Sequence, residues 1–332
     1  MKLTFVNFGA DICGSNRVLF EVANGLIERG HEVDYLALQP NRWFPLKTEI
    51  KVCENPQALK DSVTESDIVV ASWCMTAYIV DAVKGRKGVS TYYCQHYEPI
   101  FFIRPEEQVT ADKTYDLPLT LIVNSPWLQQ QLKEKHNRES KVIVPGVNHE
   151  VFQQKPVQKN PNILRVMAFA SSMPFKGFYD TVLPAFQFVS RRLGNVEFHL
   201  FGNTDLPVPY EFKVAKHGRL KDSELAELYN NCDLFVSGSW AESSPLSHLE
   251  AMACGCPVVS TPFGTEHFGV AIERVPPRAP RVLGAKIVEV LGNSQKRAEM
   301  ARRGLTDVQE FSWDRTVDAV ERFFKGLLGK SA

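Results

Sequence analysis

The sequence predicts an α/β protein of two domains, each built on a parallel sheet that helices cover on both faces. Short runs rich in β-branched and aromatic residues alternate with segments of helical periodicity through both halves. Such alternation is typical of parallel sheets, because a crossover, usually a helix, must join each strand to the next. The length of 332 residues fits two domains of ~100–200 residues each. The polar run Pro145–Pro161 between the halves is interpreted as the linker.

The first half contains an apolar stripe of helical spacing from Val18 to Ile27, which Gly30 closes. Further helices are expected around 75–84 and 126–136. The strands expected in this half are Lys2–Phe8, Glu32–Leu38, Asp67–Ala71, Val89–Cys94, Leu119–Val123 and Lys141–Val144.

The second half repeats the pattern and ends in an amphipathic helix from Trp313 to about Leu328. The strands expected there are Leu164–Ala170, Val196–Phe201, Lys213–His217, Leu234–Ser237 and Pro257–Ser260. The other helices are expected near 177–192, 222–230, 245–254, 281–291 and 295–310.

Charge and composition exclude several classes of protein. Lys plus Arg and Asp plus Glu both number 38, and this balance argues against general nucleic-acid binding, which needs a basic face. The seven cysteines form no C-x-x-C pair, so we expect reduced thiols in a cytoplasmic protein. The N-terminal residues show no signal-peptide pattern, and no apolar run approaches the ~18 residues of a membrane span. The sequence thus predicts a soluble, or at most peripheral, protein.

The stretch Ser237–Pro262 has the pattern of a loop, a helix and a strand. Pro245 suits the first helical position, and Ser244 the N-cap before it. Gly255 is expected to end the helix. A loop that opens onto a helix N-terminus suits a phosphate, because the first N–H groups and the positive end of the helix dipole point there.

Two carboxylates flank this helix start, Glu242 in the loop and Glu250 more than a turn inside the helix. Glu250 would then reach hydroxyls attached to the phosphate, as in a nucleotide-sugar site. A second interpretation stays open, since Ser247-x-x-Glu250 also matches a capping box. Glu242 alone would be an ordinary surface acid.

The combination of these carboxylates with the residues that follow resembles the family-4 retaining glycosyltransferases of GT-B fold. The resemblance rests on Glu242-x7-Glu250 followed by Ala251-Met252-Ala253-x-Gly255-x-Pro257-Val258-Val259. It implies two Rossmann-like domains that face each other across a cleft, with the acceptor in the first and a nucleoside-diphosphate sugar mainly in the second. The implied boundaries are 1–150, 151–311 and, for a helix that crosses back to the first domain, 312–332.

The resemblance also implies roles for residues of the second domain. Glu242 would hold donor-sugar hydroxyls and Glu250 the ribose hydroxyls, and Lys176 with the helix start would hold the diphosphate. The loop residues implied in donor binding are Ser243, Ser244, Pro245 and Leu246. Transfer would retain the anomeric configuration without an enzymic nucleophile. The chain contains no Asp-x-Asp, and neither a metal nor a cofactor is expected.

The loop around Lys176 precedes a predicted helix, Ser171-Ser-Met-Pro-Phe-Lys176-Gly177. A Lys at the mouth of a parallel sheet is well placed as a point charge for phosphate. The family commonly has an Arg where this chain has Ser171. Of the family's Arg and Lys pair, this chain therefore has only the Lys. A solvated surface Lys is the alternative.

Two glycine-containing turns complete the expected donor contacts. Gly14 follows the first strand, where the family has a Gly pair, but Cys13 replaces its partner. The spacing is not G-x-G-x-x-G, so a dinucleotide cofactor is poorly supported. The turn Gly218-Arg219-Leu220 resembles the family's turn near the base, where Arg219 would stack on the base or reach the phosphates. Plain turns are the alternative at both places.

Aromatic residues alternate with Gln, His and Glu in Tyr92-Tyr-Cys-Gln-His96-Tyr97-Glu98-Pro99 and suit a sugar. The stretch resembles a Gln-x-Tyr-Glu-Pro segment of some bacterial rhamnosyltransferase-like proteins. His96 could orient an acceptor hydroxyl, and a structural histidine is the alternative.

The acceptor class stays open between a saccharide, a lipid-linked molecule and a small molecule. The helix with Lys133 and Lys135 could contact an anionic membrane if the acceptor is lipid-linked, and a solvated helix face is the alternative. Two other functions also stay open: a sugar-nucleotide epimerase of GT-B fold, and a non-catalytic sugar-nucleotide-binding protein. Oligomeric state is not indicated.

Overall fold

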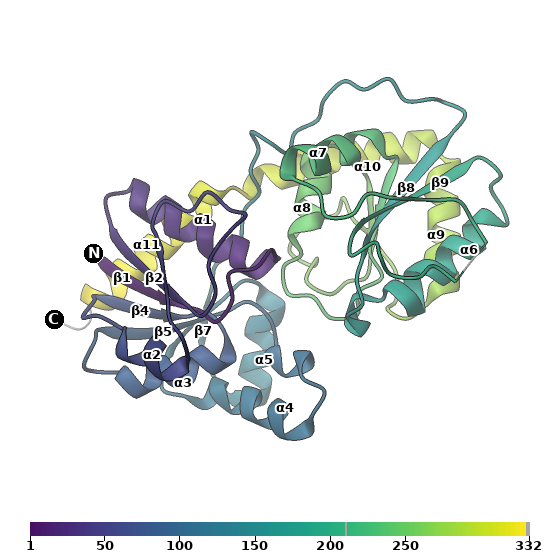
Figure 1. Cartoon of the computed structure of the whole chain (residues 1–332). Helices are drawn as coiled ribbons and strands as arrows, with labels where there is room; N and C mark the ends of the chain where they lie inside the picture. The colour runs from purple at the N-terminus through teal and green to yellow at the C-terminus, as the bar shows by residue number, and fades with distance from the viewer. Residues whose placement is uncertain (210, 330–332) are drawn as a thin grey trace. The chain divides into compact units, whose positions relative to one another are not determined.

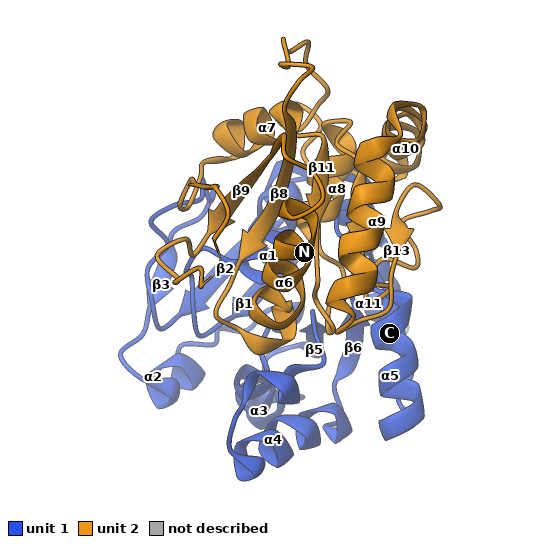
Figure 2. Cartoon of the chain, turned by 90° about the vertical axis from the view of Figure 1, so that its right-hand side faces the viewer, with its two compact units in different colours: residues 1–146, 313–332 blue, residues 147–312 orange. Residues whose placement is uncertain are grey.

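Over residues 1–209 and 211–329, which the computed structural model describes, the chain divides into two compact units (Figure 2). Unit 1 comprises residues 1–146 with the described part of 313–332, and unit 2 comprises residues 147–312. The chain therefore enters unit 2 after Gly146 and leaves it after Ser312. Among the described residues, no helix is long and apolar enough to span a bilayer.

Unit 1 is a parallel sheet with strand order β3-β2-β1-β4-β5-β6-β7. The order reverses beside β1, which pairs with both β2 and β4, and ligands of such sheets bind at the carboxyl ends of the strands near this point. The strands are β1 (Lys2–Val6), β2 (Glu32–Ala37), β3 (Ile50–Val52), β4 (Ile68–Ala71), β5 (Val89–Cys94), β6 (Thr120–Val123) and β7 (Ser140–Val142).

The helices of unit 1 include the C-terminal one, which packs on α1 (Figure 1). A Cβ on Gly25 of α1 would lie 2.5 Å from Val317 Cγ2, so the absence of a side chain lets the two helices approach. Arg29 donates to Asp318 at 2.7 Å beside this contact. The helices are α1 (Gly14–Glu28), α2 (Pro56–Asp61), α3 (Cys74–Val83), α4 (Pro105–Asp112), α5 (Pro126–His136) and α11 (Trp313–Gly329).

Unit 2 is a second parallel sheet, with strand order β10-β9-β8-β11-β12-β13. Its strands are β8 (Leu164–Ala170), β9 (Val196–Gly202), β10 (Val214–Lys216), β11 (Leu234–Val236), β12 (Val258–Ser260) and β13 (Glu273–Arg274). Its helices are α6 (Leu183–Ser190), α7 (Asp222–Asn231), α8 (Leu246–Ala253), α9 (Pro280–Gly292) and α10 (Ser294–Asp307). Both units are therefore α/β units with parallel sheets, as predicted.

One predicted helix is wrong in detail. The segment expected as a single helix over 177–192 begins with a π-helical turn at Phe178–Val182 and becomes α-helical only at Leu183. Pro184 has no N–H to donate to the carbonyl one turn back, so a regular α-helix could not run through this position unbroken.

Candidate functional site

Lys176 and Glu242 form an ion pair in unit 2, with 2.6 Å between Lys176 Nζ and Glu242 Oε1. Lys176 follows β8 and Glu242 follows β11, and these strands are parallel neighbours in the sheet. Their carboxyl ends therefore deliver the two side chains to one place. The sheet thus brings together the two residues to which the sequence assigned the diphosphate and the donor sugar.

The two loops approach each other so closely that a side chain would not fit between them. Gly177 is left-handed, with φ of 65°, and a Cβ on it would lie 2.1 Å from the carbonyl oxygen of Gly238. Trp240 N–H donates to the Phe175 carbonyl at 2.8 Å across the same contact. These contacts fix the backbone on either side of the ion pair.

Ser239 forms a hydrogen bond with Glu242 and was not among the predicted site residues. Its hydroxyl donates to Glu242 Oε1 at 2.9 Å, and the residue is buried. The Ser239 carbonyl accepts a hydrogen bond from the hydroxyl of Thr261, the residue that follows β12. A serine three residues before a loop carboxylate is too common in sequences to indicate this role.

The start of α8 lies one residue later than predicted. Pro245 is the N-cap, because its ψ of 110° is not helical, and Leu246 is the first helical residue. Ser244 does not cap the helix; its hydroxyl lies 3.5 Å from His267 Nε2. Ser243 is buried beside it. The helix N-terminus nevertheless follows the loop that leaves β11 at the carboxyl end of the sheet.

Glu250 lies inside α8, where only 8% of its surface is exposed. Its Oε2 is 3.5 Å from Tyr229 Oη of α7, a distance at the outer limit for a hydrogen bond. Ser247 lies within the helix and therefore cannot be the N-cap of a capping box with Glu250. That alternative interpretation of Glu250 is wrong.

His248 joins α8 to the end of β12 and is a second unpredicted member of the site. Its Nε2 lies 2.8 Å from Ser260 Oγ, and the side chain is buried. Burial lowers the pKa of His248 to about 4, although the Glu242 carboxylate opposes the shift. The residue is therefore a neutral hydrogen-bonding link close to a carboxylate and an ammonium group.

Two further residues that were predicted to bind the donor also follow strands of unit 2, Ser171 directly after β8 and Arg219 after β10. Ser171 is buried, and its Oγ accepts from the Met173 N–H at 3.2 Å, so it shapes the loop instead of supplying charge. Arg219 is exposed and follows β10, the edge strand that β9 separates from β8.

Another cation near this loop escaped the sequence analysis. The guanidinium carbon of Arg278 lies 4.0 Å from the centre of the Trp240 ring. Arg278 has a left-handed backbone, with φ of 53°, and its side chain is exposed. The residue follows β13, so its charge adds to those at the carboxyl edge of this sheet.

Gly14 and His96 belong to unit 1. Gly14 is the first residue of α1, and the preceding Cys13 caps the helix by accepting from Asn16 N–H at 3.4 Å. His96 follows β5, and its ring packs at 4.9 Å from Phe101 and 6.3 Å from Trp127. Both residues therefore lie at the carboxyl edge of the unit 1 sheet.

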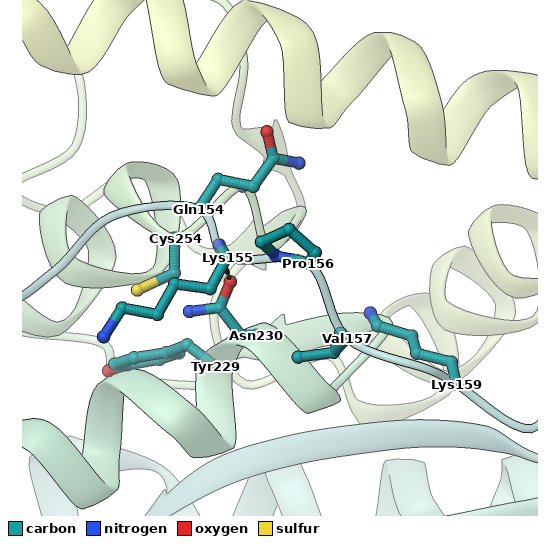
Figure 3. A pocket seen from close by; sticks show the side chains of 9 residues that line it. Gln154, Lys155, Pro156, Val157, Lys159, Tyr229, Asn230 and Cys254 are labelled. Carbon is teal, nitrogen blue, oxygen red and sulfur yellow. Dashed lines mark hydrogen bonds between the residues drawn. The ribbon is translucent and has the colours of Figure 1, made fainter.

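A cavity of about 420 Å³ in unit 2 lies away from the ion pair, where α7 and α8 end (Figure 3). Asn230 holds its wall by accepting from the Lys155 N–H at 2.7 Å. Tyr229 and Cys254 line it, but none of the predicted donor residues does. Among the described residues, no group of three or more His, Cys, Asp or Glu could hold a metal ion.

Sequence comparison relates the part of the chain that carries this site to glycosyltransferases. Residues 163–293 match the family model described as Glycosyl transferases group 1. The chain is 27% identical over 274 residues to the O-antigen biosynthesis protein RfbC of Myxococcus xanthus, covering 80% of this chain and 21% of RfbC. It is 27% identical over 223 residues to the uncharacterized glycosyltransferase MJ1178 of Methanocaldococcus jannaschii, covering 62% and 59%. The chain thus spans less than two thirds of the length of these relatives.

Solved structures show the same fold over nearly the whole chain. Sucrose-phosphate synthase from Thermosynechococcus elongatus superposes with a TM-score of 0.81 at 15% identity, covering 99% of both chains. Anabaena HepE in complex with UDP-glucose superposes with a TM-score of 0.81 at 17% identity, covering 98% of this chain and all of HepE. The protein has the GT-B fold of these glycosyltransferases, with two Rossmann-like units, as predicted.

Proposed function

We propose that the protein is a retaining glycosyltransferase that moves a sugar from a nucleoside-diphosphate sugar to an acceptor hydroxyl. The observation that carries the proposal is the Lys176–Glu242 ion pair at neighbouring strand ends. It joins a cation suited to phosphate with a carboxylate suited to sugar hydroxyls, inside the region that matches the glycosyltransferase family.

Different residues of unit 2 would bind different parts of the donor. Glu242 accepts from hydroxyls of the donor sugar, while Lys176 binds the diphosphate together with the N-terminus of α8. Glu250 accepts from the ribose hydroxyls. Because one Lys176 ammonium serves both Glu242 and the phosphate, the sugar and the adjoining phosphate would bind at a fixed separation.

The protein's contribution to catalysis would be positioning and stabilisation of the leaving diphosphate. Negative charge grows on the diphosphate as the glycosidic bond breaks, and Lys176 offsets it. The departing phosphate then accepts the proton of the acceptor hydroxyl, and the acceptor oxygen bonds to the anomeric carbon on the face that the phosphate leaves, so the configuration is retained. His96 in unit 1 is proposed to orient that hydroxyl. Neither a metal ion nor a cofactor takes part in this proposal.

The biological setting is proposed from the relatives. RfbC is an O-antigen biosynthesis protein, and this name supports a role in glycan or glycoconjugate biosynthesis. The acceptor would be a saccharide, a lipid-linked molecule or a small molecule, and the enzyme would work in the cytoplasm, with or without peripheral membrane contact.

The experiment that tests the proposal begins with donor binding. UDP and UDP-glucose come first, because the HepE structure contains UDP-glucose, and other nucleoside diphosphates and their sugars follow by calorimetry. Donors that bind are then incubated with an acceptor panel, with and without EDTA. Mass spectrometry identifies the product and NMR its anomeric configuration. An epimerised donor without acceptor would identify an epimerase, and binding without any turnover a non-catalytic protein.

A further inference from the structure

Five aromatic rings gather at the carboxyl edge of the unit 1 sheet. Trp73 follows β4, His96 follows β5, and Trp127 follows β6, which are consecutive strands. Phe101 and Phe102 come from the turn after His96. The centres of the Trp73 and Phe101 rings are 5.5 Å apart, and those of His96 and Trp127 are 6.3 Å apart. We call these five residues the aromatic platform.

The rings of the platform are not fully buried, although Trp127 also packs against the hydrophobic core of unit 1. Each of the five is partly exposed, and Ile103, next in sequence to Phe102, has 94% of its surface exposed. The sheet below them already has a closed core, because the ends of β4, β5 and β6 are fully buried. Partly exposed aromatic rings gathered at the ligand-binding edge of a parallel sheet are typical of a binding site.

Buried hydrogen bonds hold the platform rigid. Glu98 Oε2 accepts from Cys74 N–H at 2.5 Å, so it ties the start of α3, beside Trp73, to the turn that carries the phenylalanines. Asn124 donates to the Gln95 carbonyl at 2.9 Å and so links the segment before Trp127 to the residue before His96. The backbone segments that carry the rings are thus held together before any ligand binds, which reduces the ordering that binding requires.

We propose that the aromatic platform binds the acceptor, and that the acceptor presents an uncharged pyranose ring. The proposal rests on the proposed function and specifies its acceptor. The C–H groups on one face of a pyranose form an apolar patch that stacks on an aromatic ring, while the ring hydroxyls reach His96 and the indole N–H groups. All five platform residues are aromatic, so the platform itself contains no Lys or Arg that could bind the phosphate of a phosphorylated acceptor.

Two carboxylates beside the platform disfavour an anionic membrane as its occupant. The exposed residues Glu106 and Glu107 lie in the first turn of α4, immediately after Ile103 and Arg104. Arg104 already lies 3.9 Å from Glu107. A bilayer surface rich in anionic lipid would be repelled by these carboxylates, whereas a neutral saccharide would not.

Saturation-transfer NMR tests the proposal with the methyl glycosides of glucose, mannose, rhamnose and N-acetylglucosamine, with the protein saturated with UDP. We expect saturation of the C–H protons on one face of at least one glycoside. Trp127→Ala and Phe101→Ala should each weaken that binding roughly two- to tenfold, the range expected for one aromatic contact. Trp127→Phe should restore most of it.

Phe323→Ala is the matched control, because Phe323 is a partly exposed ring of α11 in the same unit but outside the platform. It should leave glycoside binding unchanged. Calorimetry with UDP and the other nucleoside diphosphates separates the two proposals: if none of them binds the parent protein, the proposed function is refuted, whereas binding of one of them without any glycoside signal would refute the platform alone. Equal glycoside binding by the parent and both alanine variants would also overturn it. So would binding of phosphatidylglycerol vesicles that Ile103→Ser abolishes, in the absence of glycoside binding.

Discussion

Lys176 Nζ lies 2.6 Å from Glu242 Oε1, although the two residues are 66 positions apart in the sequence. The pair is largely shielded, with 24% of the Lys176 side chain and 11% of the Glu242 side chain exposed. Removing one partner of a shielded pair leaves the other charge uncompensated. Each residue therefore affects both the anion site and the sugar site. For a variant of either residue, binding of the nucleoside, of the nucleoside diphosphate and of the complete donor must be measured separately.

Lys176→Ala should weaken binding of a nucleoside diphosphate about ten- to a hundredfold, as expected for loss of a hydrogen bond to a charged group. Affinity for the bare nucleoside should change little, and turnover should fall further than binding, because charge grows on the leaving oxygen in the transition state. Calorimetry with UDP and uridine measures the first two effects. The companion variant Ser171→Arg should bind UDP as well as the parent or better. If Lys176→Ala binds UDP normally, the anion site lies elsewhere, and Arg278 or Arg219 becomes the next residue to test.

Glu250→Ala should weaken UDP binding about ten- to a hundredfold for the same reason, with little change in melting temperature. Tyr229→Phe is its matched control, because it removes only the contact at 3.5 Å, whose length indicates a weak bond. Tyr229→Phe should therefore change UDP affinity by less than about threefold, which is well below the loss expected for Glu250→Ala. Normal UDP binding by Glu250→Ala would refute the ribose assignment.

Ser239→Ala should act through Glu242. Without the bond of 2.9 Å the carboxylate keeps its ion pair with Lys176 but loses one of the groups that orient it, so turnover of the donor sugar should fall roughly tenfold or more. UDP lacks the sugar that Glu242 would bind, so its affinity should stay within about twofold, far from a tenfold step. Ser223→Ala, at an exposed position in α7, is the control. A parallel loss of UDP affinity and melting temperature would indicate a purely structural serine.

Much of the fold could be predicted because a buried parallel strand is a continuous apolar run. Strand β3 (Ile50–Val52) was not predicted because it lacks that signal. It lies at the edge of its sheet and has one partly exposed and two exposed residues. Helix α4 was missed for a similar reason, since Ala111 is the one buried residue described within it.

The sequence indicated candidate residues of the site but not the contacts between them. Glu242 and Lys176 each lie in a recognisable local pattern, but their pairing depends on β8 and β11 being neighbours, which no local pattern states. Ser239 and His248 act through side-chain geometry alone. The start of α8 was misplaced by one residue, because it depends on the ψ of Pro245, and proline fixes only φ.

Gly177→Ala should disturb the site through the backbone. A left-handed alanine costs about 1 to 2 kcal/mol, and its Cβ would lie 2.1 Å from the Gly238 carbonyl oxygen, so one loop must move. We expect a loss of about 2 kcal/mol or more in the free energy of unfolding and weaker UDP binding. Gly194→Ala is the control, because a Cβ there meets no atom within 4 Å. Unchanged stability of Gly177→Ala in urea titrations would show that the loops do not need this approach.

Glu98→Gln should change how stability depends on pH. Burial raises the pKa of Glu98 from 4.5 to about 8, and hydrogen bonds from Tyr92 Oη and Cys74 N–H oppose the shift only in part. Between these two values the folded protein keeps a proton that the unfolded chain releases. The stabilisation is therefore complete below pH 4.5 and is lost as the pH rises toward 8, by about 1.4 kcal/mol per pH unit at most.

The glutamine has no proton to lose, so the free energy of unfolding of Glu98→Gln minus that of the parent should increase with pH across this window and level off above it. Urea titrations at about pH 5, 7 and 9 measure the difference. Glu106→Gln removes an exposed carboxylate of α4 and should show no comparable increase. A difference that stays flat with pH would mean that Glu98 is ionised in the folded protein. Glu98 also anchors the aromatic platform, so a glutamine that keeps the bond to Cys74 N–H should leave glycoside binding intact at pH 7, whereas Glu98→Ala should weaken it.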